Sequence, residues 1–336
     1  MFSKKKISWT DDDSDEEVEV QMETPPPQDG NTAAEPPAKS KAVPGLSDPR
    51  TLIIAQERKI STIEERLNRL AVNERFALMS DSASSVIEGT IKSIIIGGDP
   101  GLGKTHEVVE NLLKKKYKRV ENEDYILIKA GVSAFGVYKF VVLMAERAET
   151  AHALRAEKEK ENIERVKRNL KPLPIKVKIP VIVFDDVPLW KGEPRLLELV
   201  KGLTDTSDRR IVSWLTDRAE LDPEKAKKLG KLPAQVEYTG GVIIITNEDR
   251  KVMNDAIVDR SIWLPIEVSE MEMAERMRTL LPKIMPHMDN KLKNQVLNWL
   301  LSNEYEGKER SMRTLVKALQ LANANPNNWL RMVQIV

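Results

Sequence analysis

The sequence reads Gly98-Asp99-Pro100-Gly101-Leu102-Gly103-Lys104-Thr105 between an apolar run, 93–96, and a helix-like segment, 106–113. Glycines at these positions let several backbone N–H groups point inward, at the positive end of the following helix. This is the pattern of a phosphate-binding P-loop, in which strand, loop, Lys-Thr and helix come in this order. A chance glycine turn before a helix is the alternative, and the complete order of elements argues against it.

The P-loop pattern assigns expected roles to its residues. Lys104 is expected to reach the β- and γ-phosphates of a nucleotide, and Thr105 to place its hydroxyl on Mg²⁺. ATP and Mg²⁺ are therefore the predicted cofactors. The expected nucleotide-binding residues are Gly98, Asp99, Pro100, Gly101, Leu102, Gly103, Lys104, Thr105 and His106.

Two carboxylates end a later apolar strand. The run 181–184 is followed by Asp185 and Asp186. In a P-loop sheet the first acid holds the Mg²⁺ shell, and the second can polarise the attacking water. A strand that ends in Asp-Asp can also be a turn or a helix cap. Because a P-loop precedes it, we predict that Asp185 is a metal ligand and that Asp186 is catalytic.

Apolar runs alternate with helical patterns along the chain, which predicts a parallel sheet covered by helices on both faces. The expected strands are 93–96, 124–128, 180–184, 242–246 and 262–266. From residue 270 onward, three or four amphipathic helices, including 292–301 and 312–322, predict a second, all-helical domain.

These motifs together resemble those of the AAA+ ATPases. The P-loop has the GxPGxGKT form of that family, and the pair Asp185-Asp186 resembles its Walker B motif. Further along, Thr246-Asn247 resembles sensor 1, 255–260 resembles the helix that ends in an arginine finger, and 311–315 resembles sensor 2. The resemblance covers roughly residues 85–325. It departs at Asp186, where the family usually has glutamate, one methylene longer.

The resemblance implies roles for three further residues. Asn247 would hydrogen-bond the water or the γ-phosphate from a fixed strand end. Arg260 would supply positive charge to the transition state at a neighbouring subunit's ATP. Arg313 would contact the γ-phosphate from the helical domain.

Alternatives remain for both arginines. Arg260 can instead pair with Asp259 or Asp255 on the surface. Arg313 can make an ordinary helix ion pair, and Arg310 is its competitor as sensor 2.

The implied fold class is α/β: a P-loop parallel five-stranded sheet with helices on both faces, of the AAA+ type, followed by a small all-helical lid domain. The expected segments are a disordered tail, an N-terminal helix with a linker, the ATPase domain and the lid domain. Their bounds are 1–48, 49–82, 83–268 with a charged helical extension at about 146–171, and 269–336.

The tail differs from the rest of the chain in charge. Residues 1–48 hold 5 Lys and no Arg against 11 Asp and Glu, so the remainder carries 48 basic against 41 acidic residues. Proline runs and an acidic block, 11–17, predict disorder. Such a tail can dock a partner, can mimic nucleic acid or can simply keep the protein soluble.

Residues 49–79 are expected to form a helix, followed by a polar linker, 80–85. The helical stripe consists of Ile53, Ile60, Ile63, Leu67 and Leu70. Packing on the same chain and packing on a partner are equally open.

Three other segments have two interpretations each. The segment 132–136 resembles an aromatic-glycine pore loop, but Ser133 can instead cap a helix that sends aromatic residues into the core. The segment 113–119 is basic and can contact phosphates or complement a helix dipole. The extension at 146–171 can touch a substrate or a subunit, or be a solvated face.

Composition excludes several classes of protein. The chain has no cysteine, which excludes disulfides, cysteine zinc sites and thiol catalysis. No segment has the apolar length of a membrane span, and the N-terminus lacks a signal-peptide pattern. We therefore expect no membrane partner and a cytoplasmic protein, in the host cytoplasm if the chain is viral.

The expected function is that of an oligomeric ATPase, a ring or helical homo-oligomer such as a hexamer, that remodels a macromolecular complex. DNA or a DNA-bound protein is the expected partner, in replication or recombination, as for a helicase loader. The segment 196–214 looks similar to ATPases of bacterial viruses. The alternatives are a chaperone that threads polypeptide and a nucleotide-gated assembly factor that hydrolyses slowly.

Overall fold

The computed structural model describes residues 63–117, 124–129, 131–207, 209–216, 219–302, 305 and 309–335. These residues belong to one compact unit, Ile53–Val336. The acidic tail expected over 1–48 and the first part of the helix expected over 49–79 lie outside the described residues. In the part of the chain that the structure describes, no helix is both long and apolar enough to cross a membrane.

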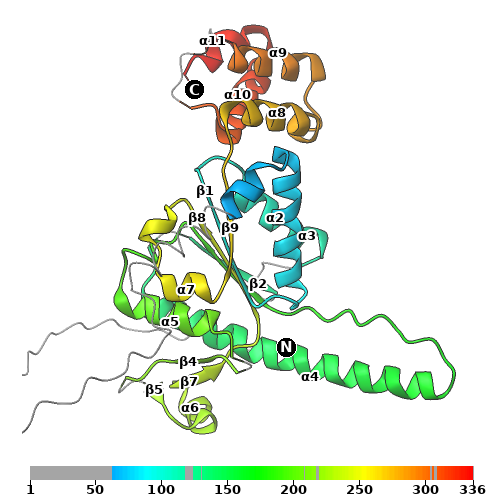
Figure 1. Cartoon of the computed structure of the whole chain (residues 1–336), viewed down its shortest axis with the longest axis vertical. Coiled ribbons are helices and arrows are strands. Elements are labelled where there is room, and N and C mark those ends of the chain that lie inside the picture. Colours follow the sequence, from blue (N-terminus) through cyan, green and yellow to red (C-terminus); the bar gives the residue numbers. More distant parts are fainter. Residues whose placement is uncertain are drawn as a thin grey trace, which may run out of the picture. The chain divides into compact units, whose positions relative to one another are not determined.

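Five parallel strands form the central sheet, in the order β2-β3-β8-β1-β9 (Figure 1). Their bounds are β1 Ser93–Gly98, β2 Tyr125–Lys129, β3 Val181–Asp185, β8 Gly241–Thr246 and β9 Ile262–Ile266. In the register, Ile95 of β1 pairs with Ile244 on one side and with Trp263 on the other. Strands that are buried on both faces consist of continuous runs of Ile and Val, which explains why these strands can be predicted from the sequence. The predicted five-stranded parallel sheet is confirmed.

Helices cover both faces of this sheet. Successive strand residues alternate between two cores: Ile94 and Ile96 pack with α2 and α3, whereas Ile95 packs with α4, α5 and α7. The bounds of these helices are α2 Val72–Ile87, α3 Lys104–Lys114, α4 Ala134–Lys167, α5 Pro194–Thr204 and α7 Asp255–Asp259, with a short 3₁₀ turn, η2, at Arg250–Val252. The predicted α/β fold class is therefore confirmed.

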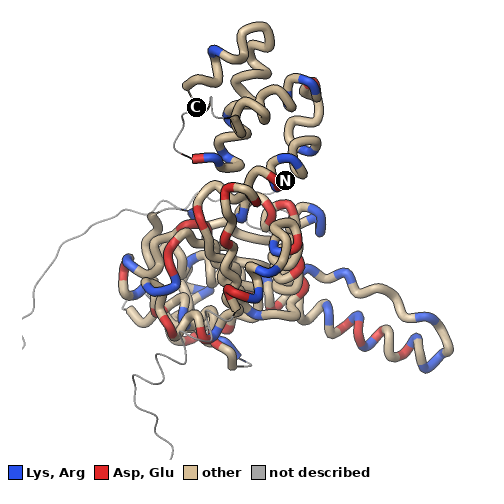
Figure 2. Tube along the Cα trace, turned by 45° about the horizontal axis from the view of Figure 1, so that its top comes forward, with Lys and Arg blue, Asp and Glu red and all other residues tan. Residues whose placement is uncertain are grey.

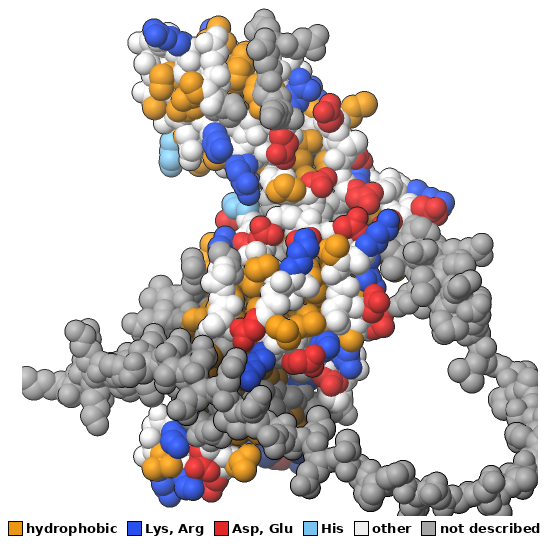
Figure 3. Space-filling view, turned by 90° about the vertical axis from the view of Figure 1, so that its left-hand side faces the viewer, with side chains coloured by type: hydrophobic (Ala, Val, Ile, Leu, Met, Phe, Trp, Pro, Cys, Tyr) orange, Lys and Arg blue, Asp and Glu red, His pale blue; other side chains and the backbone are white. Residues whose placement is uncertain are grey.

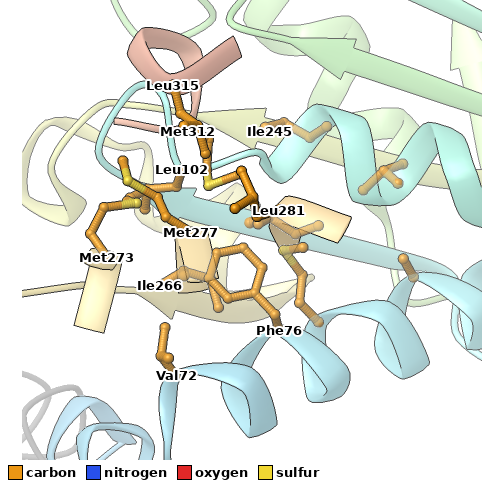
Figure 4. Close-up of a cluster of buried hydrophobic side chains, with 14 of the residues drawn as sticks. Val72, Phe76, Leu102, Ile245, Ile266, Met273, Met277, Leu281, Met312 and Leu315 are labelled. Carbon is orange, nitrogen blue, oxygen red and sulfur yellow. The ribbon is translucent and has the colours of Figure 1, made fainter. Parts of the chain in front are cut away.

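The C-terminal part is helical, as expected of the lid domain. Its elements are α8 Glu270–Leu280, η3 Leu281–Lys283, α9 Asn290–Leu301, α10 Met312–Ala324, η4 Pro326–Asn328 and α11 Trp329–Val333. Its apolar residues join the core of α2 and α3. Figure 4 shows Leu102 of the P-loop lying against Met273 and Met277 of α8 and Met312 of α10. One apolar cluster thus joins the phosphate-binding loop to the lid domain.

The expected helix over 49–79 and the expected linker over 80–85 are wrong within the described residues. Residues 63–68 are helical, the chain leaves the helix at 69–71, and α2 begins at Val72 and runs through the serines. The break occurs because the Glu74 carboxylate accepts the backbone N–H of Ala71 at 3.0 Å and starts a new helix. Buried Met79, Ala83 and Val86 then hold 80–85 helical. The expected boundary between residues 82 and 83 therefore falls inside α2, a helix packed in the core.

An insertion between α5 and β8 was not predicted. Two two-stranded sheets surround a short helix, with bounds β4 Ile211–Ser213, β5 Ala219–Glu220, α6 Pro223–Leu229, β6 Leu232–Pro233 and β7 Gln235–Glu237. Strands this short carry too few residues to show the alternation on which sequence-based prediction depends. The charged extension, expected at about 146–171, is helical as far as Lys167, and the chain turns at Arg168 and Asn169.

Candidate nucleotide site

The P-loop connects the end of β1 to the start of α3. Gly101 and Gly103 have φ values of 80° and 92°, in the left-handed region that favours glycine. Gly103 is the N-cap of α3, so the free N–H groups of that helix open into the loop. Nothing lies within 4 Å of a Cβ built on Gly103, whereas one built on Gly101 would lie 2.7 Å from Ser311 Cβ. The loop is thus open at Gly103 and covered by the lid domain at Gly101.

Lys104 is buried at the centre of the site. Its Nζ donates to the carbonyl oxygens of Gly98 at 2.6 Å and Asp99 at 2.8 Å, and to Asn247 Oδ1 at 2.8 Å. Burial lowers the pKa of Lys104 to about 8, against the opposing charges of Asp186, Asp99 and Asp185. The residue expected as sensor 1 therefore lies in direct contact with the P-loop lysine.

Asp185 and Thr105 lie side by side, as a magnesium site requires. Thr105 Oγ1 donates to Asp185 Oδ1 at 2.6 Å. Mg²⁺ takes one or two protein oxygens and completes its shell with phosphates and waters. Among the described residues no group of three or more His, Cys, Asp and Glu gathers as a metal site. A hydroxyl and a carboxylate at the foot of a P-loop fit Mg²⁺ held together with a nucleotide.

Lys129 is a site residue that the sequence analysis missed. It ends β2, directly beside Asp185 in the register of the sheet, and its Nζ lies 2.7 Å from Asp185 Oδ2. Asp185 is buried, while Lys129 is about half exposed. The contact between Lys129 and Asp185 could have been predicted, because the carboxyl ends of neighbouring parallel strands meet at one edge of the sheet. Both oxygens of Asp185 therefore have partners, one from the P-loop and one from β2.

Asp186 has an unusual backbone conformation. Its φ is 56°, in the left-handed region, and its side chain is exposed. Its N–H donates to Ile245 O on the neighbouring strand at 2.9 Å. This hydrogen bond fixes the turn that directs the chain away from β3. Left-handed aspartate costs less than most residues there, because its short side chain is tolerated in that region.

Arg260 lies at the opposite edge of the sheet from Lys104. It caps the C-terminus of α7, its Nη1 donates to Ala256 O at 2.7 Å, and its carbonyl accepts from Ser93 Oγ at 3.2 Å. Ser93 is the first residue of β1, whereas the P-loop follows the last, about 17 Å further along at about 3.3 Å per residue. In the described part of the chain no ion pair joins Arg260 to Asp255 or Asp259.

Arg209 and Arg210, the other arginines near that edge, are engaged elsewhere. Arg209 pairs with Glu237 at 2.6 Å, and buried Arg210 donates to the carbonyl oxygens of Leu203 and Gly240. Of the three, Arg260 is the one whose side chain donates within its own helix.

Arg310 and Arg313 have different surroundings at the start of α10. Arg310 donates to the carbonyl oxygens of Leu300 and Ser302, which end α9. Arg313 is exposed, and after burial and the nearby carboxylates its charge is among the influences on the pKa of Lys104. Met312 N–H donates to Gly101 O at 3.1 Å, which fixes the start of α10 on the P-loop. Arg310 is thus engaged with the end of α9, whereas the charge of Arg313 acts on Lys104.

The remaining P-loop residues divide between surface and core. Asp99 and Pro100 are exposed, His106 is exposed at the third position of α3, and Leu102 is buried in the apolar cluster of Figure 4. Leu102 therefore contributes its backbone to the loop and its side chain to the contact with the lid domain.

A cavity of about 500 Å³ adjoins the P-loop at Asp99. Its other lining residues are Asn68, Arg75, Glu267, Val268, Ser269 and Glu272. Buried Arg75 donates to Glu267 O and to the Glu272 carboxylate, and so joins α2 to the segment that leads into α8. Sequence analysis missed this cavity because three distant segments form it.

One open interpretation, at 132–136, is resolved toward structure, and the choice at 113–119 between phosphate contact and helix dipole stays open. Ser133 caps α4 by accepting from Gly136 N–H, and Phe135 and Tyr138 pack against Trp214. In the basic segment, Tyr117 is buried and donates to Ile87 O and Ile179 O. Residues 118–119 lie outside the described residues.

Comparisons with known proteins find similarity to one protein sequence and to several solved structures. No protein-family model matches the chain. An uncharacterised 36.7 kDa protein from the nrdC–mobD intergenic region of Enterobacteria phage T4 is 23% identical over 288 residues, which cover 81% of this chain and 76% of that protein.

Two solved structures are similar. A mutant of RuvB from Thermotoga maritima is 10% identical with a TM-score of 0.44, over 80% of this chain and 72% of that one. AMPPCP-bound DnaA from Aquifex aeolicus is 14% identical with a TM-score of 0.40, over 75% and 62% of the two chains. RuvB and DnaA are AAA+ ATPases, the family that the motifs of this chain resemble.

Proposed function

We propose that this chain, which resembles the AAA+ ATPases in its motifs and in its fold, binds and hydrolyses ATP and uses the cycle to remodel a macromolecular complex. The observation that carries the proposal is the convergence of Lys104, Thr105, Asp185 and Asn247 at the carboxyl ends of β1, β3 and β8. In open parallel sheets, ligands bind at this edge of the strands.

Each of these residues has a task that its surroundings support. Lys104 exchanges its carbonyl partners for phosphate oxygens, since a charged ammonium that is buried needs anionic or carbonyl partners. Thr105 and Asp185 hold Mg²⁺, which when bound offsets charge on the phosphates. Asp186, exposed at the end of β3, orients and deprotonates the attacking water. Asn247 positions that water from a rigid strand end.

The base and ribose of the nucleotide fit the cavity beside Asp99. It lies where the P-loop, α2 and the segment before α8 meet, with a volume of about 500 Å³. A ligand held there touches the sheet domain and the lid domain together. Arg313, whose charge reaches Lys104, would then sense the γ-phosphate from the lid side.

Hydrolysis needs a second subunit in this proposal. Arg260 lies at the edge of the sheet away from its own P-loop, as the hydrogen bond from Ser93 indicates. A guanidinium that acts on the γ-phosphate must therefore come from a neighbouring copy. This supports a ring or helical homo-oligomer with ATP sites between subunits.

The macromolecule is proposed to be DNA or a DNA-bound protein, in replication or recombination. Support comes from charge: outside the acidic tail the chain carries 48 basic and 41 acidic residues. A helicase loader or remodeller would combine such an excess of basic residues with an ATP site. Stimulation of ATP hydrolysis by DNA, and not by an unfolded protein, is the expected result.

A second candidate is a nucleotide-gated assembly factor that hydrolyses slowly. Two observations favour it: Asp186 is shorter than the glutamate usual in the family, and Lys129 pairs with Asp185 at 2.7 Å. Phosphate release below about one turnover per minute, with tight ATP binding, would distinguish this candidate from an active remodeller.

Two variants test the proposed ATPase. Lys104→Ala should abolish ATP binding in calorimetry. The reason is that Lys104 provides the only buried ammonium among the described P-loop residues. Asp186→Asn should bind ATP with wild-type affinity and release no phosphate, because the amide keeps the shape of the carboxylate and loses its basicity. Wild-type turnover by Asp186→Asn would move the catalytic base elsewhere, and ATP binding by folded Lys104→Ala would refute the site.

A further inference from the structure

The second half of α4 forms an arm that packs on little of the chain. The buried residues of α4 end at Ala148, and the helix continues to Lys167 (Figure 1). These last 19 residues extend about 28 Å at 1.5 Å per residue. The chain then returns beside the helix over 170–180 without regular structure. Such a projection adds little to the core.

The end of this arm is held in one shape. Asn169, with φ of 55°, closes the C-terminus of α4 in the left-handed conformation. Asn162 then holds the returning segment, since its Nδ2 donates to Leu173 O at 2.8 Å and its Oδ1 accepts from Leu173 N–H at 2.7 Å. Arg165 Nε donates to Lys171 O at 3.1 Å. Three side-chain hydrogen bonds thus fix a turn that has no apolar core beneath it.

The charge changes at the point where the turn begins. Residues 146–164 contain both signs, and pairs such as Arg155 with Glu159 satisfy them within the helix. Residues 165–178, which we call the arm tip, contain six Lys and Arg and no Asp or Glu. In Figure 2 the helix of the arm carries both red and blue positions, whereas the turn and the returning segment carry blue positions and no red ones.

Four cations of the arm tip have no carboxylate partner in the described chain: Arg165, which donates to Lys171 O instead, and the exposed Arg168, Lys171 and Lys176. Lys167 pairs with Glu164, and Lys178 with Asp124, each at 2.8 Å. All residues from 166 to 176 are exposed. On the face shown in Figure 3, by contrast, basic and acidic side chains are intermixed over the described surface.

Helix electrostatics account for only part of this pattern. Cations in the last turn of a helix complement its dipole, which explains Arg165, Lys167 and Arg168. Lys171 and Lys176 lie beyond the helix, where the dipole has little effect. A solvated surface would also carry both signs, as the first part of the arm does. The single sign and the fixed turn together point to a polyanionic ligand.

We propose that the arm tip binds the phosphate backbone of duplex DNA. This inference rests on the proposed function: the arm tip is the surface through which the ATPase would meet its nucleic acid. Cations on a fixed turn contact phosphates without reading sequence. The arm tip has no Trp, Tyr, Phe or His, so it lacks the stacking side chains with which proteins hold single strands. Duplex DNA is therefore favoured over single-stranded DNA.

The test uses the full-length protein with Arg168, Lys171 and Lys176 all changed to Glu. Binding to a labelled duplex of mixed sequence is measured by fluorescence anisotropy without nucleotide, from about 50 to about 200 mM KCl. We expect affinity to fall at least about tenfold, and the slope of log K against log salt to become shallower by about 3, one for each phosphate that the variant no longer neutralises. The charge-preserving variant R168K/K171R/K176R should bind as the wild type does.

Lys227, Lys228 and Lys231 provide the matched control. The first two are exposed lysines of α6, the third is exposed just after it, and their change to Glu alters net charge by the same amount. This control should lose less than about threefold in affinity, because long-range charge alone is screened in salt. Equal losses in both variants, or none in the arm-tip variant, would overturn the proposal. Arm-dependent binding to phosphatidylserine vesicles or to a peptide of residues 8–20, with none to duplex DNA, would also overturn it.

Phosphate release measured on the same preparations separates this proposal from the proposed function. The arm-tip variant should keep the basal ATPase rate and lose its stimulation by DNA, since the altered residues lie outside the nucleotide site. A wild type that binds duplex DNA through the arm tip but never hydrolyses ATP would refute the ATPase alone. A wild type that hydrolyses ATP but does not bind duplex DNA would refute the arm-tip proposal alone.

Discussion

Lys104 carries the strongest electrostatic constraint among the residues of the nucleotide site. Burial lowers its pKa to about 8, from an ordinary value of 10.5. The folded state disfavours the ammonium, so between about pH 8 and 10.5 the unfolded chain binds more protons than the folded one. The contribution of Lys104 to stability is therefore unfavourable below pH 8 and improves as the pH rises through this window. The attraction of Lys104 for phosphates, by contrast, weakens as the pH rises, because the ammonium loses its charge.

We predict that ATP affinity decreases as the pH rises above 8, because a growing fraction of Lys104 is then neutral in the nucleotide-free protein. Calorimetric titrations at pH 7 and pH 9 measure the effect, which should approach tenfold for one titrating group. Lys104→Arg is the matched variant, since a guanidinium stays charged at both pH values. The same decrease in Lys104→Arg would assign the pH dependence to another group.

Lys129 contacts Asp185 Oδ2, whereas Thr105 contacts Oδ1. A metal ion held by Thr105 and Asp185 would share this carboxylate with the Lys129 ammonium, so the two cations compete for its charge. Lys129→Met should therefore raise the affinity for Mn²⁺, a paramagnetic substitute for Mg²⁺, by about two- to fivefold, as expected for a half-exposed ion pair. Electron paramagnetic resonance with bound ADP measures free Mn²⁺ directly.

Lys201→Met is the control for this prediction, because Lys201 makes a comparable surface pair with Glu198 on α5. Its Mn²⁺ affinity should equal that of the wild type. If Lys129→Met binds Mn²⁺ more weakly, Lys129 orients Asp185 for the ion and does not compete with it.

Sequence-based prediction was informative for residues whose motif fixes their surroundings. The P-loop and the strand that ends in Asp185 dictate each other's position through the parallel sheet, so their proximity followed from the pattern. Lys129 and Arg75 have no motif: their contacts depend on how distant segments meet. The different surroundings of Arg310 and Arg313 could not be predicted either, because both lie at the same helix end in the sequence.

At the scale of elements, the least accurate prediction concerned the N-terminal helix. Its serines suggested a linker, yet Asn111 Nδ2 donates to Ser80 Oγ at 2.9 Å and Ser85 Oγ donates to Asp81 O, so these hydroxyls are satisfied inside a helix. Helix α2 packs on α3, β1 and α8, which places it in the core. Propensity is weak evidence where tertiary packing decides.

The contact between α10 and the P-loop is testable with two glycines. Gly101→Ala and Gly103→Ala share the strain of a left-handed alanine, about 1 kcal/mol each. Only the new Cβ at Gly101 would meet Ser311, at 2.7 Å, which adds about 1 to 3 kcal/mol of overpacking. Calorimetry without nucleotide should therefore give a lower Tm for Gly101→Ala than for Gly103→Ala. Equal Tm values would mean that the lid domain does not rest on the loop.

At the scale of the whole molecule, we predict that ATP hydrolysis is shared between copies of the chain. Lys104→Ala removes the phosphate-binding residue, and Arg260→Ala removes the residue at the opposite edge of the sheet, so neither variant should hydrolyse ATP alone. Mixed subunits should recover activity, at about a quarter of the interfaces in an equal mixture, where an intact P-loop meets an intact arginine.

The mixing experiment requires proof of subunit exchange from labelled chains and a concentration at which light scattering detects oligomers. No recovery in exchanged mixtures, while Arg260→Ala binds ATP normally, would contradict the shared site. Activity of Arg260→Ala alone would contradict it more directly.

Helix α4 runs as one uninterrupted helix from the candidate nucleotide site to the arm tip. Its N-cap, Ser133, follows the strand that carries Lys129, and its 34 residues span about 50 Å. In mechanical terms the helix is a lever whose N-terminal end follows the strand of Lys129. A rotation of about 5° about that end shifts the backbone by about 2 Å at Ala148 and by about 4 Å at the far end, close to the 3.4 Å rise of one nucleotide in DNA.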